Sequence, residues 1–215
     1  MACPGRSPPE KPLTRPLVLL AHGAGAGQSS PFMKYWRSGL EADCDVSVFE
    51  YAYMRKPGRR PPPRLPTLLA EHQEKLDTLR DKHPSRQVFL VGKSMGSRVG
   101  CHLANAIRDH APVQGLVCLG YPLKGRSSLR DEVLRELRTP VLFVQGTRDP
   151  LCPLALLAEV RPAMASRNDL HVVQGGDHSL QLRKRDRAEL SVTQEEVDAT
   201  SLAATLSFIS ELASS

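Results

Sequence analysis

The sequence predicts a doubly wound α/β domain, in which helices cover both faces of a mostly parallel, six-stranded sheet. Six short apolar runs recur along the 215-residue chain, and most of them are β-branched or wholly apolar, as strands buried on both faces must be. Segments with helical periodicity separate these runs. Because strands that alternate with helices imply crossover connections, this order indicates a parallel sheet. The length suits a single domain, which we expect to span residues 15–215.

The predicted elements follow one another along the whole chain. The apolar runs predict strands over residues 16–23, 45–53, 87–92, 113–122, 140–146 and 170–176. The periodic segments predict helices over residues 66–82, 94–109, 129–138, 153–165 and 193–213. Thr193 and Glu196 stand at the spacing of a capping box, which supports the start of the last helix. Residues 54–64 combine proline with arginine and predict an exposed loop.

Charge and cysteine content narrow the classes of partner and cofactor. The formal net charge is +6, but the basic residues are scattered, with dense clusters only at residues 55–64 and 183–187. Aromatic residues do not interleave with these cations, so we expect no nucleic-acid binding. Five cysteines without a C-x-x-C pair argue against a disulfide framework and against a zinc site. We expect neither a metal nor a cofactor.

The cysteine content, the hydropathy and the first residues together predict a soluble, intracellular protein, either cytoplasmic or nuclear. No run approaches the roughly 18 consecutive apolar residues that cross a bilayer, so we expect no membrane insertion. The opening residues hold no apolar run long enough for a signal peptide. Residues 1–14 are rich in proline and polar groups, which predicts a disordered tail.

A serine between two glycines stands where a predicted strand gives way to a helix. Gly92, Ser94 and Gly96 fit the pattern G-x-S-x-G, which places a nucleophilic serine on a tight strand-to-helix turn. Small residues are needed at the two glycine positions because larger side chains would collide with the strand and the helix. An ordinary helix cap is the alternative role for Ser94. The apolar run before the serine and the helical segment after it favour the nucleophile.

Two further side chains occur in the chain order that such a nucleophile requires, which is serine, acid, histidine. Asp149 comes directly after the fifth predicted strand, and His178 comes directly after the sixth. With Ser94 they form a candidate catalytic triad. Each also has a plainer interpretation, Asp149 as a turn residue before a proline and His178 as a partner for backbone groups. Asp177 is the rival acid, but neighbouring side chains rarely face each other, so we expect it to shape the loop.

The loop after the first predicted strand supplies the remaining element of an acyl-transfer site. Gly23 and Gly25 flank Ala24, so the Ala24 N–H can reach an oxyanion from the side opposite the Met95 N–H. The helix that begins beside Ser94 adds its positive end at the same place. A phosphate-binding glycine loop is the alternative, but the run lacks the G-x-x-x-x-G-K-[ST] pattern.

These motifs resemble those of a known family, the α/β-hydrolases, and in particular the group that includes testis-expressed protein 30 and the hydrolase-like domain of subunit 3 of the NSL complex. The resemblance rests on the segments HGAG, GKSMGSR, GLVCLGYPL, LRDEVLRELRTPVLFVQGTRDPLC and GGDHSL and covers residues 16–212. It implies a compact hydrolase fold that begins at the strand before the oxyanion loop. It also implies that Ser94 is the nucleophile, Asp149 the acid and His178 the base. Lys93 is a departure, since relatives carry arginine there, and members of the group include scaffolding subunits.

The functional prediction is a serine hydrolase that cleaves a small acyl ester or thioester through an acyl-enzyme intermediate. About 18 residues separate the fourth predicted strand from the fifth, which leaves room for a minimal lid and an open site. We expect Tyr121 and Leu123 to line one wall of that site. Nearby cations would favour small, polar or anionic acyl groups; the candidates are Lys93, Lys124, Arg126 and Arg148. The alternative is a catalytically silent module of the same fold, whose cationic segments 54–64 and 182–187 bind a protein partner.

Overall fold

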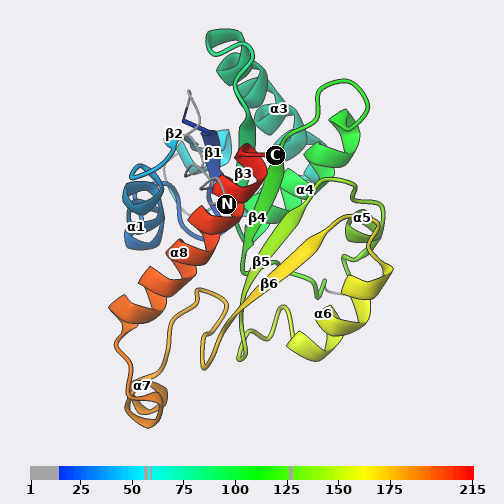
Figure 1. Ribbon diagram of the computed structural model, residues 1–215. Coiled ribbons are helices and arrows are strands. Elements are labelled where there is room, and N and C mark those ends of the chain that lie inside the picture. Colours follow the sequence, from blue (N-terminus) through cyan, green and yellow to red (C-terminus); the bar gives the residue numbers. More distant parts are fainter. Residues whose placement is uncertain (1–14, 56–57, 59, 126–127) are drawn as a thin grey trace, which may run out of the picture.

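The computed structural model describes residues 15–55, 58, 60–125 and 128–215, and the tail expected at residues 1–14 lies outside them. The strands are β1 (Leu17–Ala21), β2 (Asp45–Phe49), β3 (Val88–Lys93), β4 (Gly115–Leu119), β5 (Val141–Gly146) and β6 (Asn168–Val173). The helices are α1 (Pro31–Leu40), α2 (Ala52–Arg55), α3 (Leu65–Lys82), α4 (Met95–Ile107), α5 (Glu132–Arg135), α6 (Leu154–Val160), α7 (Lys184–Leu190) and α8 (Gln194–Ala213), with a 3₁₀ turn at Arg161–Ala163. Figure 1 shows how these elements are arranged.

All six strands form one parallel sheet in the order β2-β1-β3-β4-β5-β6. The predicted α/β architecture is therefore confirmed, and the sheet is wholly rather than mostly parallel. The chain moves from β1 outward to β2 and then crosses back to β3 on the other side of β1. The direction of winding thus reverses between β1 and β3. Such a reversal leaves a crevice at the carboxyl ends of the two strands, where open α/β sheets bind their ligands.

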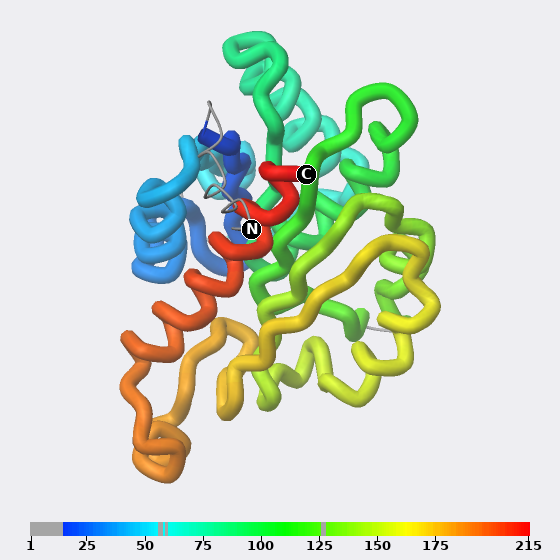
Figure 2. The backbone as a smooth tube through the Cα atoms, in the orientation of Figure 1, coloured from blue at the N-terminus to red at the C-terminus, as the bar shows by residue number. Residues whose placement is uncertain are grey.

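Two layers of helices cover the sheet, because each strand sends alternate side chains to opposite faces. Along β1, Val18 and Leu20 pack on the side of α1 and α8, whereas Leu17, Leu19 and Ala21 pack on the side of α3 to α6. Figures 1 and 2 show α8 running across one face of the sheet and α3 and α4 behind the other. Every residue of β1, β3, β4 and β5 is buried, as coverage on both faces requires.

The helices differ from the predicted ones on both sides of the sheet. The structure adds α1, α2 and α7, none of which the sequence analysis predicts. Ser30 caps α1 by accepting a hydrogen bond from the Met33 N–H at 3.4 Å, and Met33, Trp36 and Leu40 form its buried stripe. The helix expected over residues 129–138 is only the four-residue α5. The predicted capping box is present at the start of α8.

Candidate active site

Ser94 occupies a strained turn between β3 and α4. Its backbone has φ 50° and ψ −109°, in the left-handed half of conformational space that non-glycine residues rarely adopt. The turn is fixed by backbone contacts, because the Ser94 N–H donates to the Leu119 carbonyl at 3.0 Å. The Ser94 carbonyl accepts from the Ser97 hydroxyl at 2.6 Å. This geometry lifts the Ser94 side chain out of the end of the sheet, as the G-x-S-x-G pattern predicts.

The two glycines of this turn are required by close approach of the backbone. A Cβ atom at Gly92 would lie 2.3 Å from the Ser97 nitrogen, and one at Gly96 would lie 2.6 Å from the Ala21 carbonyl oxygen. Neither contact can be relieved by a side-chain rotation, since both involve main-chain atoms. The loop glycines differ. A Cβ atom at Gly23 would make ordinary contacts from 3.4 Å, and one at Gly25 would meet nothing within 4 Å.

The structure brings Ser94, His178 and Asp149 together in one hydrogen-bonded chain. The His178 Nε2 atom lies 2.8 Å from the Ser94 Oγ atom, and the His178 Nδ1 atom lies 2.7 Å from the Asp149 Oδ2 atom. With its proton on Nδ1, the imidazole donates to the carboxylate and accepts from the hydroxyl. The three residues follow β3, β5 and β6, whose carboxyl ends share one edge of the sheet. The Asp149 side chain is fully buried, whereas that of His178 is 23% exposed.

Asp149 is held in its charged form by donors on both oxygens. Besides His178, its Oδ2 atom accepts from the Gln145 amide at 2.6 Å, and its Oδ1 atom accepts from the Leu151 N–H at 2.8 Å. Burial raises the pKa of this carboxyl, but the hydrogen bond and charge of His178 and the bonds from Leu151 and Gln145 outweigh it, so the net pKa lies below the ordinary value. The carboxylate is therefore a stable partner for the imidazole.

Gln145 belongs to the same hydrogen-bonded chain, and the sequence analysis misses it. It is fully buried on β5 and its Oε1 atom accepts from the Tyr121 N–H at 3.1 Å. The amide thus joins the turn after β4 to Asp149. The available signal is a single polar residue at the end of the otherwise apolar run PVLFVQG.

The rival acid, Asp177, shapes the loop that carries His178. Its Oδ1 atom accepts from the N–H groups of Ser179 at 2.7 Å and Gln181 at 3.0 Å. The Asp177 N–H also donates to the Gln181 carbonyl at 3.0 Å. The carboxylate therefore closes a turn within its own loop, while Asp149 faces the imidazole.

The loop expected to form the oxyanion site lies against the serine. Gly23, Ala24 and Gly25 line the same cavity as Ser94. The Tyr53 hydroxyl donates to the Ala24 carbonyl at 3.2 Å and lies 3.9 Å from the Met95 sulfur, so Tyr53 contacts both residues expected to supply oxyanion N–H groups. The sequence analysis assigns no role to Tyr53, because it lies in a segment expected to continue the second strand.

His22 has a structural role at the base of this loop. It is fully buried, and burial lowers its pKa despite the opposing hydrogen bond to Gly23. Its Nε2 atom accepts from the Tyr51 N–H at 3.1 Å, which leaves Nδ1 to donate to the Gly23 carbonyl at 2.7 Å. The neutral imidazole therefore ties the start of the loop to the segment that follows β2.

A cavity of about 480 Å³ opens above Ser94 at the carboxyl edge of the sheet. Its lining is mainly small and apolar, and Lys93 and His178 are its ionisable side chains. The residues are Gly23, Ala24, Gly25, Ala26, Ser30, Pro31, Phe32, Met33, Lys93, Ser94, Leu151, His178 and Ser179. The start of α1, which the sequence analysis does not predict, thus forms one wall.

The expected wall of Tyr121 and Leu123 is wrong. Both residues are fully buried, and neither lines the cavity. The Tyr121 hydroxyl donates to the Arg130 carbonyl at 2.8 Å, and its ring packs edge-on against Phe143. The physical reason is Gly120, whose φ of 66° turns the chain after β4 into the core on the side of α3 to α6.

Of the four cations expected near the site, Lys93 alone lines the cavity within the described part of the chain. Arg148 instead pairs with Asp186 at 2.9 Å. Lys124 is exposed, and Arg126 lies outside the described residues. The predominantly apolar lining therefore does not match the expected cluster of cations.

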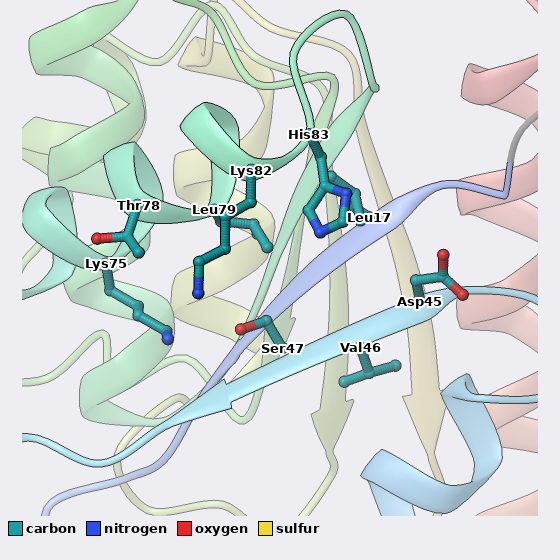
Figure 3. Close-up of a pocket in the computed structure, with 9 residues that line it drawn as sticks. All are labelled: Leu17, Asp45, Val46, Ser47, Lys75, Thr78, Leu79, Lys82 and His83. Atoms are coloured by element: carbon teal, nitrogen blue, oxygen red, sulfur yellow. The ribbon is translucent and has the colours of Figure 1, made fainter.

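A second hollow lies at the opposite end of the sheet. Leu17 and Asp45, the first residues of β1 and β2, line a cavity of about 260 Å³ beside Lys75, Lys82 and His83 (Figure 3). Because Ser94 follows the carboxyl end of β3, this hollow is remote from the Ser94 chain. Across residues 15–55, 58, 60–125 and 128–215, there is no group of three or more potential metal ligands. None of the helices in these ranges has the length and apolar character needed to span a bilayer.

Comparisons with known proteins agree with this architecture. The chain is similar in structure to an alpha-beta serine hydrolase homologue from Coxiella burnetii, with a TM-score of 0.65 and 15% sequence identity over 87% of this chain and 88% of that chain. It is also similar to Est1E from Butyrivibrio proteoclasticus (TM-score 0.63, 14% identity, 89% of each chain). A third similar structure is the RedJ thioesterase from Streptomyces coelicolor (TM-score 0.60, 17% identity, 92% of this chain and 95% of that chain). At these identities the likeness shows a shared fold. The family model described as alpha/beta hydrolase domain matches residues 14–209, and the chain therefore belongs to that family.

Proposed function

We propose that this protein is a serine hydrolase that cleaves a small acyl ester or thioester through an acyl-enzyme intermediate. The observation that carries the proposal is the chain of two hydrogen bonds, 2.8 Å from Ser94 Oγ to His178 Nε2 and 2.7 Å from His178 Nδ1 to Asp149. A nucleophile bonded to a base, with the base oriented by a buried acid, is the arrangement that activates a serine hydroxyl.

The proposed reaction has two acyl-transfer steps. His178 takes the hydroxyl proton while Ser94 Oγ attacks the carbonyl carbon, and the resulting tetrahedral intermediate collapses as His178 returns the proton to the departing alcohol or thiol. Water then attacks the acyl-enzyme by the same route and releases the acid. Asp149 stays charged throughout, which its lowered pKa supports, and stabilises the imidazolium that forms in each step.

The N–H groups of Ala24 and Met95 are proposed to stabilise the oxyanion. Met95 is the first residue of α4, so its N–H has no acceptor within the helix. This N–H also lies at the positive end of the helix dipole. In the described residues neither N–H donates a loop or side-chain hydrogen bond. Donors of this kind contribute most when they are fixed in place before the reaction. The contacts of Tyr53 and Gly96 with this region supply that rigidity.

The cavity supports a small substrate. Its volume of about 480 Å³ lies within the range of small-molecule sites, and Ala26, Phe32 and Leu151 give it apolar surface for an acyl chain. The short connection between β4 and β5 leaves little chain to form a lid. The proposal includes both esters and thioesters, because both present a carbonyl carbon that Ser94 can attack.

A catalytically silent module that binds a protein partner is less well supported. One of the two cationic segments expected to bind the partner, residues 182–187, leads into α7, and its Arg183 and Arg185 pair with Asp186. The other, residues 54–64, lies partly outside the described residues. Arg148 also pairs with Asp186. These ion pairs neutralise part of the charge that the partner would need to recognise.

The proposal can be tested without knowing the natural substrate. Purified wild-type protein should react with a fluorophosphonate probe at Ser94, and Ser94→Ala should abolish that labelling. Hydrolysis of p-nitrophenyl acetate and butyrate should fall by about 10⁴-fold or more in both Ser94→Ala and His178→Ala, since members of a triad act as a unit. Circular dichroism of each variant controls for folding. Equal hydrolysis by the wild type and Ser94→Ala, or a folded wild type that the probe does not label, would contradict the proposal.

A further inference from the structure

Lys93 is a buried cation next to the proposed nucleophile. It is the last residue of β3 and precedes Ser94 directly, yet only 8% of its surface is exposed. Its ammonium lies 5.4 Å from the centre of the Phe32 ring, on the side of the sheet that α1 covers. Burial of a charged group costs free energy unless a specific contact offsets it. A charged side chain at this buried position therefore indicates that its ammonium makes a specific contact.

That contact is the main chain of His178. The Lys93 Nζ atom donates a hydrogen bond to the His178 carbonyl, 85 residues further along the chain. In the described residues no backbone N–H donates to this carbonyl. The imidazole of His178 is thus held at one end by Asp149, while the backbone that carries it is held by Lys93.

The end of β4 leaves room for this contact. A Cβ atom at Gly120 would lie 2.7 Å from the His178 carbonyl oxygen, 3.0 Å from the Lys93 Nζ atom and 3.5 Å from the His178 Nδ1 atom. The ammonium and the imidazole therefore both lie against the same glycine. A side chain at residue 120 would separate Lys93 from the loop that carries His178.

The pKa of Lys93 shows that keeping its ammonium charged at this buried position costs free energy. Burial lowers the pKa of Lys93 to about 8, although the carboxylates of Asp149 and Asp177 favour the charged form. An apolar side chain at residue 93 would avoid the free-energy cost of burying a charge. Perturbed ionisable groups of this kind gather at functional sites.

We propose that Lys93 is a positioning residue, whose ammonium holds the His178 main chain so that the imidazole stays within hydrogen-bonding distance of Ser94. This inference rests on the proposed hydrolase function. Lys93 acts through His178 and takes no part in the bond changes.

The first experiment compares Lys93→Met, Lys93→Arg and the control Lys34→Met, which removes the same charge from an exposed position on α1. With p-nitrophenyl acetate, Lys93→Met should lower kcat roughly 10- to 100-fold and change KM by less than about twofold, because displacement of a catalytic group by about 1 Å has effects of this size. Lys93→Arg, which keeps the charge and the donors, should recover most of the rate. Lys34→Met should match the wild type.

The second experiment separates positioning from general damage. The rate of fluorophosphonate labelling at Ser94 is measured for Lys93→Met in the wild-type and His178→Ala backgrounds. Lys93→Met should slow labelling when His178 is present and have no further effect when it is absent, because the lysine acts through the histidine. An equal slowing in both backgrounds, or wild-type kcat in a folded Lys93→Met protein, would overturn the inference. Failure of the hydrolase proposal itself would give a different result. His178→Ala alone would then have the same labelling rate as the wild type.

Discussion

Gln145→Met would interrupt the buried hydrogen-bonded chain that ends at Ser94 while keeping the core filled. Methionine is close to glutamine in length and volume, so the substitution adds little cavity or strain. It removes two hydrogen bonds, the 2.6 Å bond donated to Asp149 and the 3.1 Å bond accepted from the Tyr121 N–H. Gln145, Tyr121 and the Asp149 side chain are all fully buried, so water does not replace the lost partners.

The expected magnitude follows from what each partner loses. The Tyr121 N–H becomes a buried donor without an acceptor, and Asp149 loses a bond to a charged group, so together they should lower the free energy of unfolding by about 3–6 kcal/mol at pH 7. For a chain of this length, this corresponds to a fall in Tm of roughly 6–24 °C. The Asp149 part requires a charged carboxylate. It is therefore complete above the ordinary pKa of 3.8 and disappears as the pH falls through the lower pKa of the folded protein.

The assay is urea unfolding and thermal melting of the wild type, Gln145→Met and the exposed control Gln181→Met, at pH 7. Activity should also fall in Gln145→Met, because Asp149 keeps only Leu151 and His178 as donors. A fall in Tm of less than about 2 °C at pH 7, equal to that of the control, would show that these two bonds do not stabilise the fold as reasoned here.

Two other predictions test the turn and the core. Gly96→Ala should lower the free energy of unfolding by about 1–3 kcal/mol and slow probe labelling, because its Cβ would lie 2.6 Å from the Ala21 carbonyl oxygen. Gly25→Ala should leave the free energy of unfolding unchanged, because its Cβ would meet nothing within 4 Å. Comparable melting of the two variants would contradict the packing argument. His72 is buried and burial lowers its pKa from 6.5 to about 3, so unfolding takes up a proton below pH 6.5 and stability should fall by about 1.4 kcal/mol per pH unit between these values. His72→Gln, which can still contact Tyr51, should flatten that pH profile in urea unfolding, and an unchanged slope would contradict it.

The sheet could be predicted because its physical signal is local. Strands buried on both faces leave short, wholly apolar runs, and a helix between each pair forces a parallel arrangement. The residues of the serine–histidine–aspartate chain share this advantage. Each stands directly after such a run, and all carboxyl ends of a parallel sheet meet at one edge, so the spacing along the chain indicates proximity in space.

The features that could not be predicted from the sequence depend mainly on contacts between elements that lie side by side in the fold. Gln145 meets the Tyr121 N–H because β5 lies beside β4, and that pairing follows from the strand order rather than from the glutamine itself. Tyr121 resembles a wall residue until the left-handed conformation of Gly120 turns it into the core. The helix α7 has only seven residues, of which one is buried, so hydrophobic periodicity gives no signal for it.

The two halves of the candidate site come from opposite sides of the point where the sheet reverses its winding. Ser94, Asp149 and His178 follow β3, β5 and β6, whereas the loop proposed to bind the oxyanion follows β1 and is tied through His22 to the segment after β2. The halves touch at Gly96, whose missing side chain lets α4 approach the carbonyls of Ala21 and His22. This contact joins one backbone to another, so no side-chain rotation can open or close it. The distance between Ser94 and the loop proposed to bind the oxyanion is therefore fixed by main-chain packing, which is the rigid support that the proposed catalysis requires.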